Sequence, residues 1–223
     1  MRNLKRMGAI LMALALVLSL NLTAFAAVED TGFSDVAADA WYADAVEYVR
    51  DNGLMSGTSA TTFAPEGTMT RAMLATTLYR AAGSPAVSGS DSFTDTADGA
   101  WYADAVLWAS QRGVISGYGN NLFGTNDPVT REQIATILWR YAGSPSADAG
   151  QDFADESEIA SYAAAAVDWA RANGVVSGVD GNRFLPGSKA TRAQVATILR
   201  NYLTMSAPVE PEQPSEEPRV LVA

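Results

Sequence analysis

Three arginines recur at nearly constant spacing, and they are the side chains of this sequence best suited to hold an anion. Arg71, Arg131 and Arg192 are separated by 60 and 61 residues, and each follows a threonine. A guanidinium binds a carboxylate through two parallel hydrogen bonds, which suits a pyruvyl ketal or a uronic acid. Each threonine is a good N-cap, so each arginine opens a helix whose first N–H groups are positive and unsatisfied. A cation in that position needs a negative neighbour.

That neighbour is either a bound ligand or a carboxylate of the chain itself. An aspartate recurs in a Phe-x-Asp element early in each repeat, as Asp35, Asp95 and Asp155. We favour ligand binding and count Asp35 and Asp95 among the candidate ligand-binding residues. In the alternative interpretation the arginines form ion pairs with these aspartates and only tie the repeats together.

The arginines end a motif that occurs three times. Each copy begins at Gly53, Gly113 or Gly174, continues with two apolar residues, Ser and Gly, and places a Phe ten positions after the first Gly. Repetition over tens of residues indicates a repeat architecture. We count the Ser-Gly pairs of this motif among the candidate ligand-binding residues; they are Ser56, Gly57, Ser116, Gly117, Ser177 and Gly178.

Two helices per repeat position this motif. In the Phe-x-Asp element the aspartate can accept hydrogen bonds from the N–H groups of a turn while the phenylalanine packs underneath. Apolar positions then recur at helical spacing until the first glycine of the motif ends the helix. The second helix begins at each Thr-Arg pair, and Gln133 and Gln194 complete capping boxes, whereas Met73 stands at that position in the first repeat. The pattern predicts an all-α protein of helix-loop-helix units.

Aromatic residues stand at the start of the first helix in each repeat. Trp41 and Trp101 occur there in two repeats, where a half-exposed indole could stack on a sugar ring; packing in the core is the alternative. The third repeat has Ser161-Tyr162 in place of Trp-Tyr and contains one residue more. We therefore predict a weaker site in that repeat, unless Tyr162 takes over the stacking.

The two ends of the chain and its composition further limit the possible location, sites and partners of the protein. Residues 1–26 have the basic start, apolar run and Ala-Phe-Ala site of a secretory signal peptide. Residues 206–223 are rich in Pro and Glu, which predicts a disordered tail. The absence of Cys and His excludes disulfides and every metal or catalytic site built on a thiol or an imidazole. A net charge of −10 excludes bulk attraction to nucleic acid, and after signal cleavage we expect no membrane partner.

The ordered motifs F-S-D-V, W-Y-A-D-A-V, G-x-x-S-G-x-x-x-x-x-F-x-P and T-R-A-x resemble S-layer homology repeats. The resemblance covers about residues 32–204. It implies repeats at 29–88, 89–148 and 149–205, between the signal peptide and the tail. It also implies an all-α fold in which three pseudo-threefold helix-loop-helix repeats share a helical core and form grooves between neighbours. The T-R-A-E motif of the family keeps its Arg in all three repeats and its final Glu in none.

The resemblance further implies a function. It predicts a secreted module at the cell wall of a bacterium with a Gram-positive-type envelope. There the module would bind an anionic, pyruvylated secondary cell wall polysaccharide non-covalently, through grooves that contain the arginines. Other surface-layer proteins would be further partners. The alternative is a structural or oligomerising envelope component with degenerate grooves, because repeats can be kept for their shared core alone.

Catalysis and metal binding are disfavoured by the residues themselves. Asp44 and Asp104 recur, but their helical placement fits solvated faces better than the paired acid and base of an enzyme. Asp180-Gly181-Asn182 resembles part of a calcium loop but lacks its further oxygen ligands and its closing Glu. We therefore predict no catalytic residue, no metal and no cofactor.

Overall fold

The computed structural model describes residues 31–146 and 152–205, and this part of the chain is all-α, as predicted. The predicted signal peptide and tail lie outside the described residues. The described helices are α2 (Ala43–Asp51), α3 (Arg71–Ala81), α4 (Ala103–Gln111), α5 (Arg131–Tyr141), α6 (Ala164–Ala172) and α7 (Arg192–Thr204), with a 3₁₀ turn at Glu156–Glu158. None of these helices is long and apolar enough to cross a membrane.

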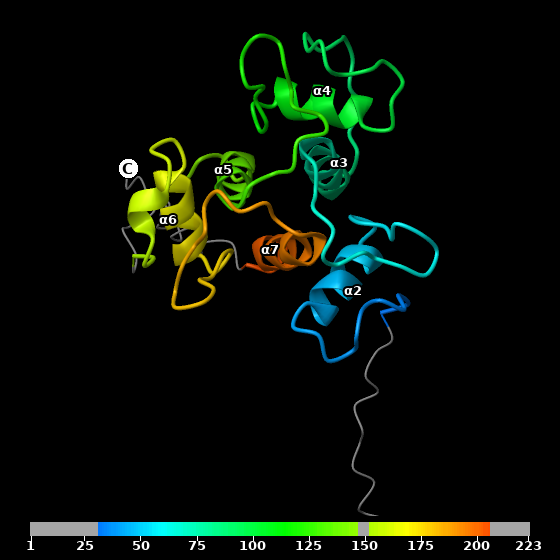
Figure 1. Ribbon diagram of the computed structural model, residues 1–223. Helices are drawn as coiled ribbons and strands as arrows, with labels where there is room; N and C mark the ends of the chain where they lie inside the picture. The colour runs from blue at the N-terminus through cyan, green and yellow to red at the C-terminus, as the bar shows by residue number, and fades with distance from the viewer. Residues whose placement is uncertain (1–30, 147–151, 206–223) are drawn as a thin grey trace, which may run out of the picture.

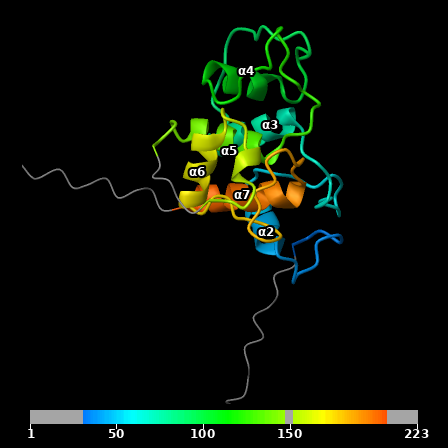
Figure 2. The same ribbon diagram turned by 60° about the vertical axis from the view of Figure 1, so that its left-hand side comes forward.

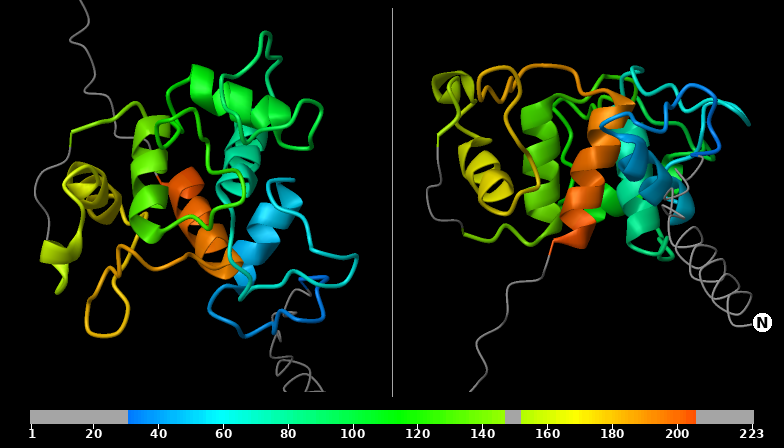
Figure 3. Two further views of the ribbon diagram at one scale, coloured as in Figure 1. Left: turned by 45° about the horizontal axis from the view of Figure 1, so that its top comes forward. Right: turned by 90° about the horizontal axis from the view of Figure 1, so that it is seen from below.

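The helices pair between repeats rather than within them. The contacting pairs are α3 with α4, α5 with α6, and α2 with α7. The first two pairs join consecutive repeats, and the third joins the first repeat to the last. Figures 1 and 2 show α3, α5 and α7 near the middle of the molecule, with α2, α4 and α6 around them. The two views of Figure 3 show the same arrangement, so the three repeats close into a ring.

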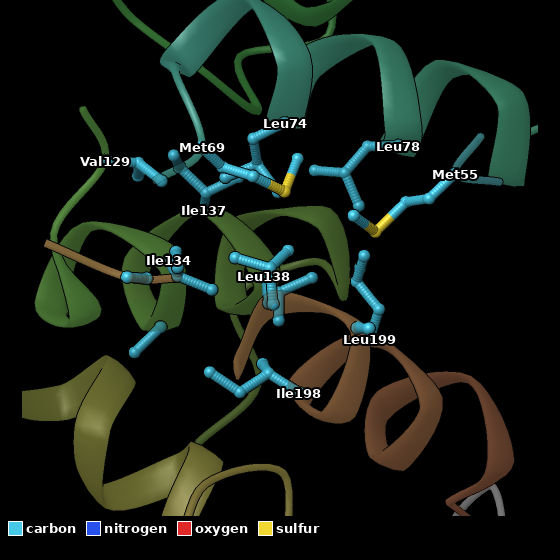
Figure 4. Close-up of a cluster of buried hydrophobic side chains, with 14 of the residues drawn as sticks. Met55, Met69, Leu74, Leu78, Val129, Ile134, Ile137, Leu138, Ile198 and Leu199 are labelled. Carbon is cyan, nitrogen blue, oxygen red and sulfur yellow. The ribbon is translucent and has the colours of Figure 1, made fainter. Parts of the chain in front are cut away.

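The core lies where the three central helices meet. Leu74 of α3, Leu138 of α5 and Leu199 of α7 are fully buried, and Figure 4 shows them among side chains that point toward one another from the three helices. Residues outside these helices add to this cluster, namely Met55 after α2 and Met69 before α3. An amphipathic helix is stabilised mainly by burying its apolar face. Each repeat therefore depends on its neighbours for that burial.

A closed ring of three backbone hydrogen bonds joins the segments that lead into the central helices. The N–H of Val129 donates to the carbonyl of Met69 (2.9 Å), that of Ala190 to Val129 (3.0 Å), and that of Met69 to Ala190 (3.2 Å). All three residues are buried, and each precedes the arginine of its repeat by two positions. The ring therefore brings the N-termini of α3, α5 and α7 together.

The local signals in the sequence predicted the helix ends well. The threonine before each of α3, α5 and α7 accepts a hydrogen bond from the third helical N–H, and Gln133 and Gln194 complete the two predicted capping boxes. Gly53, which follows α2, has a φ of 66°, a conformation in which a side chain would be strained.

Leu138→Ala on α5 tests whether the three repeats share one core. Truncation of this buried side chain should lower the free energy of unfolding by about 3 kcal/mol, through lost contacts and the cavity left behind. Amide exchange should then accelerate together in α2, α4 and α6, because all three helices pack on the same central group. Urea unfolding and hydrogen-exchange mass spectrometry measure these effects.

The control for this experiment is Leu122→Ala, at a side chain that is 42% exposed. It should change the free energy of unfolding by less than about 0.5 kcal/mol. Faster exchange in Leu138→Ala that stayed within the second repeat would contradict a shared core.

Candidate functional site

Each recurring arginine is bound to the backbone of the neighbouring repeat. Arg71 donates from Nε to the carbonyl of Phe123 (2.8 Å) and from Nη2 to the carbonyl of Ser116 (2.7 Å). The same two bonds recur from Arg131 to Phe184 (2.6 Å) and Ser177 (3.1 Å), and from Arg192 to Phe63 (2.7 Å) and Ser56 (2.6 Å). The arginine of the last repeat thus closes the ring on the first.

The recurring aspartates hold the same loops from the other side. Asp35 accepts hydrogen bonds from the N–H of Phe63 to Oδ1 (2.8 Å) and from the N–H of Ala64 to Oδ2 (2.7 Å), as predicted for a turn. Asp95 and Asp155 make the same contacts with Phe123 and Gly124 and with Phe184 and Leu185. In each loop one phenylalanine therefore donates its N–H to an aspartate and offers its carbonyl to an arginine. The two charged side chains are linked through one residue.

The alternative of direct ion pairs between these arginines and aspartates is wrong. The ion pairs of the described residues involve Arg50 and Arg183 instead. The repeats are nevertheless tied together by the arginines, as that alternative required, through backbone carbonyls rather than carboxylates.

The expectation of unsatisfied N–H groups at the helix start is also wrong. The first two N–H groups of α3, from Arg71 and Ala72, donate to the carbonyls of Asp127 (3.0 Å) and Thr125 (3.3 Å) in the next repeat. The equivalent groups of α5 and α7 find carbonyls in the same way. The loop of the next repeat, rather than a ligand, therefore caps each central helix.

The three guanidinium groups are nearly buried and remain charged. Arg71, Arg131 and Arg192 are 4%, 5% and 8% exposed. Burial lowers the pKa of each, and neighbouring acidic groups oppose this effect; the pKa of arginine is ordinarily so high that the charge persists. In the described part of the chain, Nε and Nη2 of each arginine find partners whereas Nη1 finds none. One edge of each guanidinium therefore remains available.

Each arginine lines a groove between repeats, together with a Ser loop, one face of a central helix and an exposed aromatic residue. The Tyr162 groove (about 270 Å³) contains Arg71, residues 115–118 and α5; the Trp41 groove (about 200 Å³) contains Arg131, residues 175–177 and α7; the Trp101 groove (about 160 Å³) contains Arg192, residues 54–56 and α3. The three grooves therefore combine the same elements.

Tyr162 occupies the position of Trp41 and Trp101. Each of the three lies two residues before its helix, and they are 52%, 66% and 63% exposed, respectively. The third repeat therefore lacks the indole, as its sequence shows, but has a phenol ring at this point, because the additional residue of that repeat lies upstream of Tyr162. The hydroxyl of Tyr162 donates to Glu132 (3.0 Å), and burial together with this bond raises its pKa to about 12.

The sequence profile of the S-layer homology domain matches the chain three times, at residues 32–73, 92–135 and 152–196. The chain belongs to the S-layer homology domain family. Each match begins near the Phe-x-Asp element and ends inside α3, α5 or α7. Each match thus contains one Asp, one Phe and one Arg of the contacts that join the S-layer homology ring, and the predicted resemblance is confirmed.

Curated relatives include both enzymes and surface-layer proteins. The chain is 31% identical over 188 residues to an amylopullulanase from Thermoanaerobacterium thermosulfurigenes, which is 82% of this chain and 10% of that protein. It is 29% identical over 179 residues to exoglucanase XynX from Acetivibrio thermocellus, with 78% and 16% covered. It is 35% identical over 118 residues to the surface-layer 125 kDa protein of Lysinibacillus sphaericus, with 50% and 10% covered. The chain thus spans only a small part of each relative.

The other predicted site residues divide into groove-lining and loop-holding groups. Ser56, Ser116 and Ser177 all line their grooves. Asp35 and Asp95, predicted as ligand-binding residues, are not among the lining residues of these grooves, and both carboxylates hold loop N–H groups.

Of the predicted glycines, Gly117 lines a groove, whereas Gly57 and Gly178 are not among the lining residues. Close packing explains the glycine at position 57. A Cβ there would come within 2.6 Å of the Phe33 ring, which is tighter than van der Waals contact allows.

Sequence reasoning missed a second cation in two of the three S-layer homology grooves. Arg80 lines the Trp101 groove and Arg140 lines the Tyr162 groove, whereas Asn201 stands at this point of the Trp41 groove. Arg80, Arg140 and Asn201 each follow the arginine of the Thr-Arg pair in the same repeat by nine residues, and this constant spacing is the signal in the sequence. The grooves therefore differ in charge although their backbones correspond.

Asp155→Asn should lower stability and weaken its dependence on pH. Burial raises the pKa of Asp155, but the backbone hydrogen bonds from Phe184 and Leu185 outweigh it and hold the pKa below its usual value of 3.8. Such a carboxylate stabilises the fold above about pH 4, and this contribution is lost as the pH falls through the lowered pKa. We expect a loss of about 2 kcal/mol at pH 7 and a smaller difference from the parent at pH 2.5.

Urea unfolding at pH 7, 4 and 2.5 measures this difference. Asp39→Asn, at an exposed aspartate, is the control and should follow the parent at every pH. If Asp155→Asn and the parent lost equal stability between pH 7 and pH 2.5, the role given to this carboxylate would be wrong.

Proposed function

We propose that this chain is a non-covalent anchor that binds an anionic cell wall polysaccharide in its three grooves. The observation that carries the proposal is the same in each groove: a buried arginine with one unoccupied guanidinium edge lies beside an exposed aromatic ring. A carboxylate binds such an edge through two hydrogen bonds, and a sugar ring covers an aromatic face. A sugar that carries a carboxylate, as in a pyruvate ketal, satisfies both groups.

The acidity of the chain does not oppose this proposal. At physiological ionic strength, charges more than about 8 Å apart are largely screened from one another. The carboxylates of Asp35, Asp95 and Asp155 point their oxygens at loop N–H groups rather than at the arginines. A few oriented donors at close range therefore decide the binding of an anion in each groove.

The proposed anchor comprises the predicted repeats at 29–88, 89–148 and 149–205 as one binding unit at the surface of a bacterium with a Gram-positive-type envelope. The names of the relatives support this proposal, because surface-layer proteins and polysaccharide-degrading enzymes share this region while the rest of each relative differs in name. We propose no catalysis by the unit itself, because its groove arginines and aromatic rings are binding groups.

A structural role without a ligand is the second candidate. It is favoured by the two backbone carbonyls that already hold each arginine, since these contacts join the repeats without any bound anion. The two candidates differ in whether the unoccupied guanidinium edge is used, and a binding experiment separates them.

Binding should require the carboxylate of the sugar. A methyl glycoside with a 4,6-pyruvate ketal should bind the full chain. The same glycoside with an isopropylidene ketal, which carries a methyl group in place of the carboxylate, should bind at least about tenfold more weakly, because two charge-assisted hydrogen bonds are lost. Isothermal titration calorimetry measures both. Equal binding of the two glycosides would contradict the role given to the carboxylate, and binding of neither would favour the structural candidate.

Trp41→Ala, Trp101→Ala and Tyr162→Ala should each weaken one groove. Stacking contributes on the order of 1 kcal/mol, so each truncation should weaken binding in its groove about fivefold. The thermal midpoint should stay within about 2 °C of the parent, because these side chains are exposed. Trp41→Ala and Trp101→Ala are sharper tests than Arg→Ala, which removes hydrogen bonds between repeats; Tyr162→Ala also removes one such bond, to Glu132.

Fluorescence separates the grooves, since two of them contain an exposed tryptophan and the Tyr162 groove contains none. Calorimetry should count three sites for the pyruvate ketal, whereas tryptophan quenching should report two. Leu122→Ala, exposed outside the grooves, is the control. Unchanged calorimetric affinity in all three aromatic variants would exclude stacking.

A further inference from the structure

A second cavity adjoins the Tyr162 groove and shares one residue with it. This cavity has a volume of about 330 Å³ and lies between the C-terminal ends of α3, α4 and α5. Arg140 lines both the cavity and the groove. The cavity is also lined by Arg112, Trp108 and Tyr141. Its volume falls in the usual range of small-ligand sites, and its lining combines two cations with two aromatic rings.

The walls of this cavity are fixed by their own contacts. The ring of Trp108 packs between Tyr79 and Tyr141, with centroid distances of 5.8 and 5.9 Å. The hydroxyl of Tyr79 donates to the carbonyl of Pro85 (2.9 Å), another lining residue. These contacts hold the cavity open without a ligand, so little ordering opposes binding.

The two cations of the cavity form no ion pair in the part of the chain that the structure describes. Arg112 and Arg140 are exposed, and neither guanidinium makes an ion pair or a hydrogen bond within residues 31–146 and 152–205. The dipole of its own helix favours each cation separately, because each lies at a helix C-terminus. The helix dipoles do not remove the repulsion between the two like charges that line one cavity. A bound anion would reduce this repulsion.

The corresponding positions at the other two interfaces do not reproduce this pair of arginines. Asn52 and Asn173 stand in place of Arg112, whereas Arg80 and Asn201 stand in place of Arg140. The amide of each asparagine instead donates to a carbonyl of its own helix. The pair of arginines is thus a property of this one interface and does not follow from the threefold repetition.

We infer that the Tyr162 groove and this second cavity form one extended site for a glycan segment that carries two carboxylates. Arg71 binds the first carboxylate in the groove, and Arg112 with Arg140 binds the second in the cavity. The inference rests on the proposed function, since it extends the same anionic glycan along α5. It makes the Tyr162 groove, rather than the two tryptophan grooves, the principal site for the polymer.

The test uses the full chain with Trp41→Ala and Trp101→Ala, so that the Tyr162 groove dominates binding. The probes are the methyl glycoside with one pyruvate ketal and an oligosaccharide that carries a pyruvate ketal on each terminal sugar. Into this background we place Arg112→Asn, which copies the residue that the chain itself tolerates at positions 52 and 173. Lys189→Asn, at an exposed cation outside the described cavities, is the matched control for net charge.

The two-carboxylate probe should bind the background protein more tightly than the one-carboxylate probe. Arg112→Asn should weaken the two-carboxylate probe about fivefold, which corresponds to one partly exposed ion pair, and should leave the one-carboxylate probe unchanged. Lys189→Asn should change neither. Equal affinity of the two probes in the background protein, or an Arg112→Asn effect no larger than that of Lys189→Asn, would overturn the extended site while leaving the proposed function intact. If neither probe bound even the unsubstituted chain, both proposals would fail.

Discussion

The structure depends on the burial of three arginines that form no ion pair with a carboxylate of the described residues. A buried cation is costly unless its N–H groups find acceptors, and here two backbone carbonyls of the next repeat supply them. Those carbonyls lie in reach because an aspartate holds the N–H groups of the same loop from the other side. The loop in turn caps the helix that carries the arginine. The hydrogen bonds that stabilise the buried charge are therefore also the ones that join neighbouring repeats.

Under the proposed function, this arrangement couples the binding of an anion to the stability of the fold. The backbone uses one edge of each guanidinium and leaves the other unpartnered within the described residues, so a bound anion would complete the set of acceptors. A ligand that binds only the folded ring would also stabilise it. The same geometry explains why removal of an arginine is an ambiguous test of ligand binding. Trp41, Trp101 and the second arginines line the grooves without a hydrogen bond between repeats, so they are the cleaner probes of recognition, whereas Tyr162 also donates to Glu132 of the preceding repeat.

The three grooves of this S-layer homology unit share a backbone but differ in chemistry. Their common features arise from the Asp-Phe-Arg contacts, which the fold requires at every interface. Their differences lie in groove-lining side chains: Trp or Tyr at the helix start, and Arg or Asn nine residues after the arginine of the Thr-Arg pair. Such positions are free to vary because the core does not depend on them. Repetition thus preserves the scaffold while each groove acquires its own charge and stacking surface.

Local features of the sequence determined the helices, their caps, the turn contacts of Asp35 and the threefold repetition, because each depends on residues within a few positions or on a period visible in the chain. The pairing of α2 with α7 could not be read in this way, since no local signal distinguishes packing within a repeat from packing between repeats. The partners of the arginines also depended on the tertiary structure. Every residue has a backbone carbonyl, so the sequence does not indicate which carbonyls meet the arginines. It does show which residues carry carboxylates, and Asp35 and Asp95 were therefore predicted at the ligand site. Only the closed ring decides which carbonyls meet Arg71, because that contact forms across 52 residues of chain when three separate helices bury their apolar faces together.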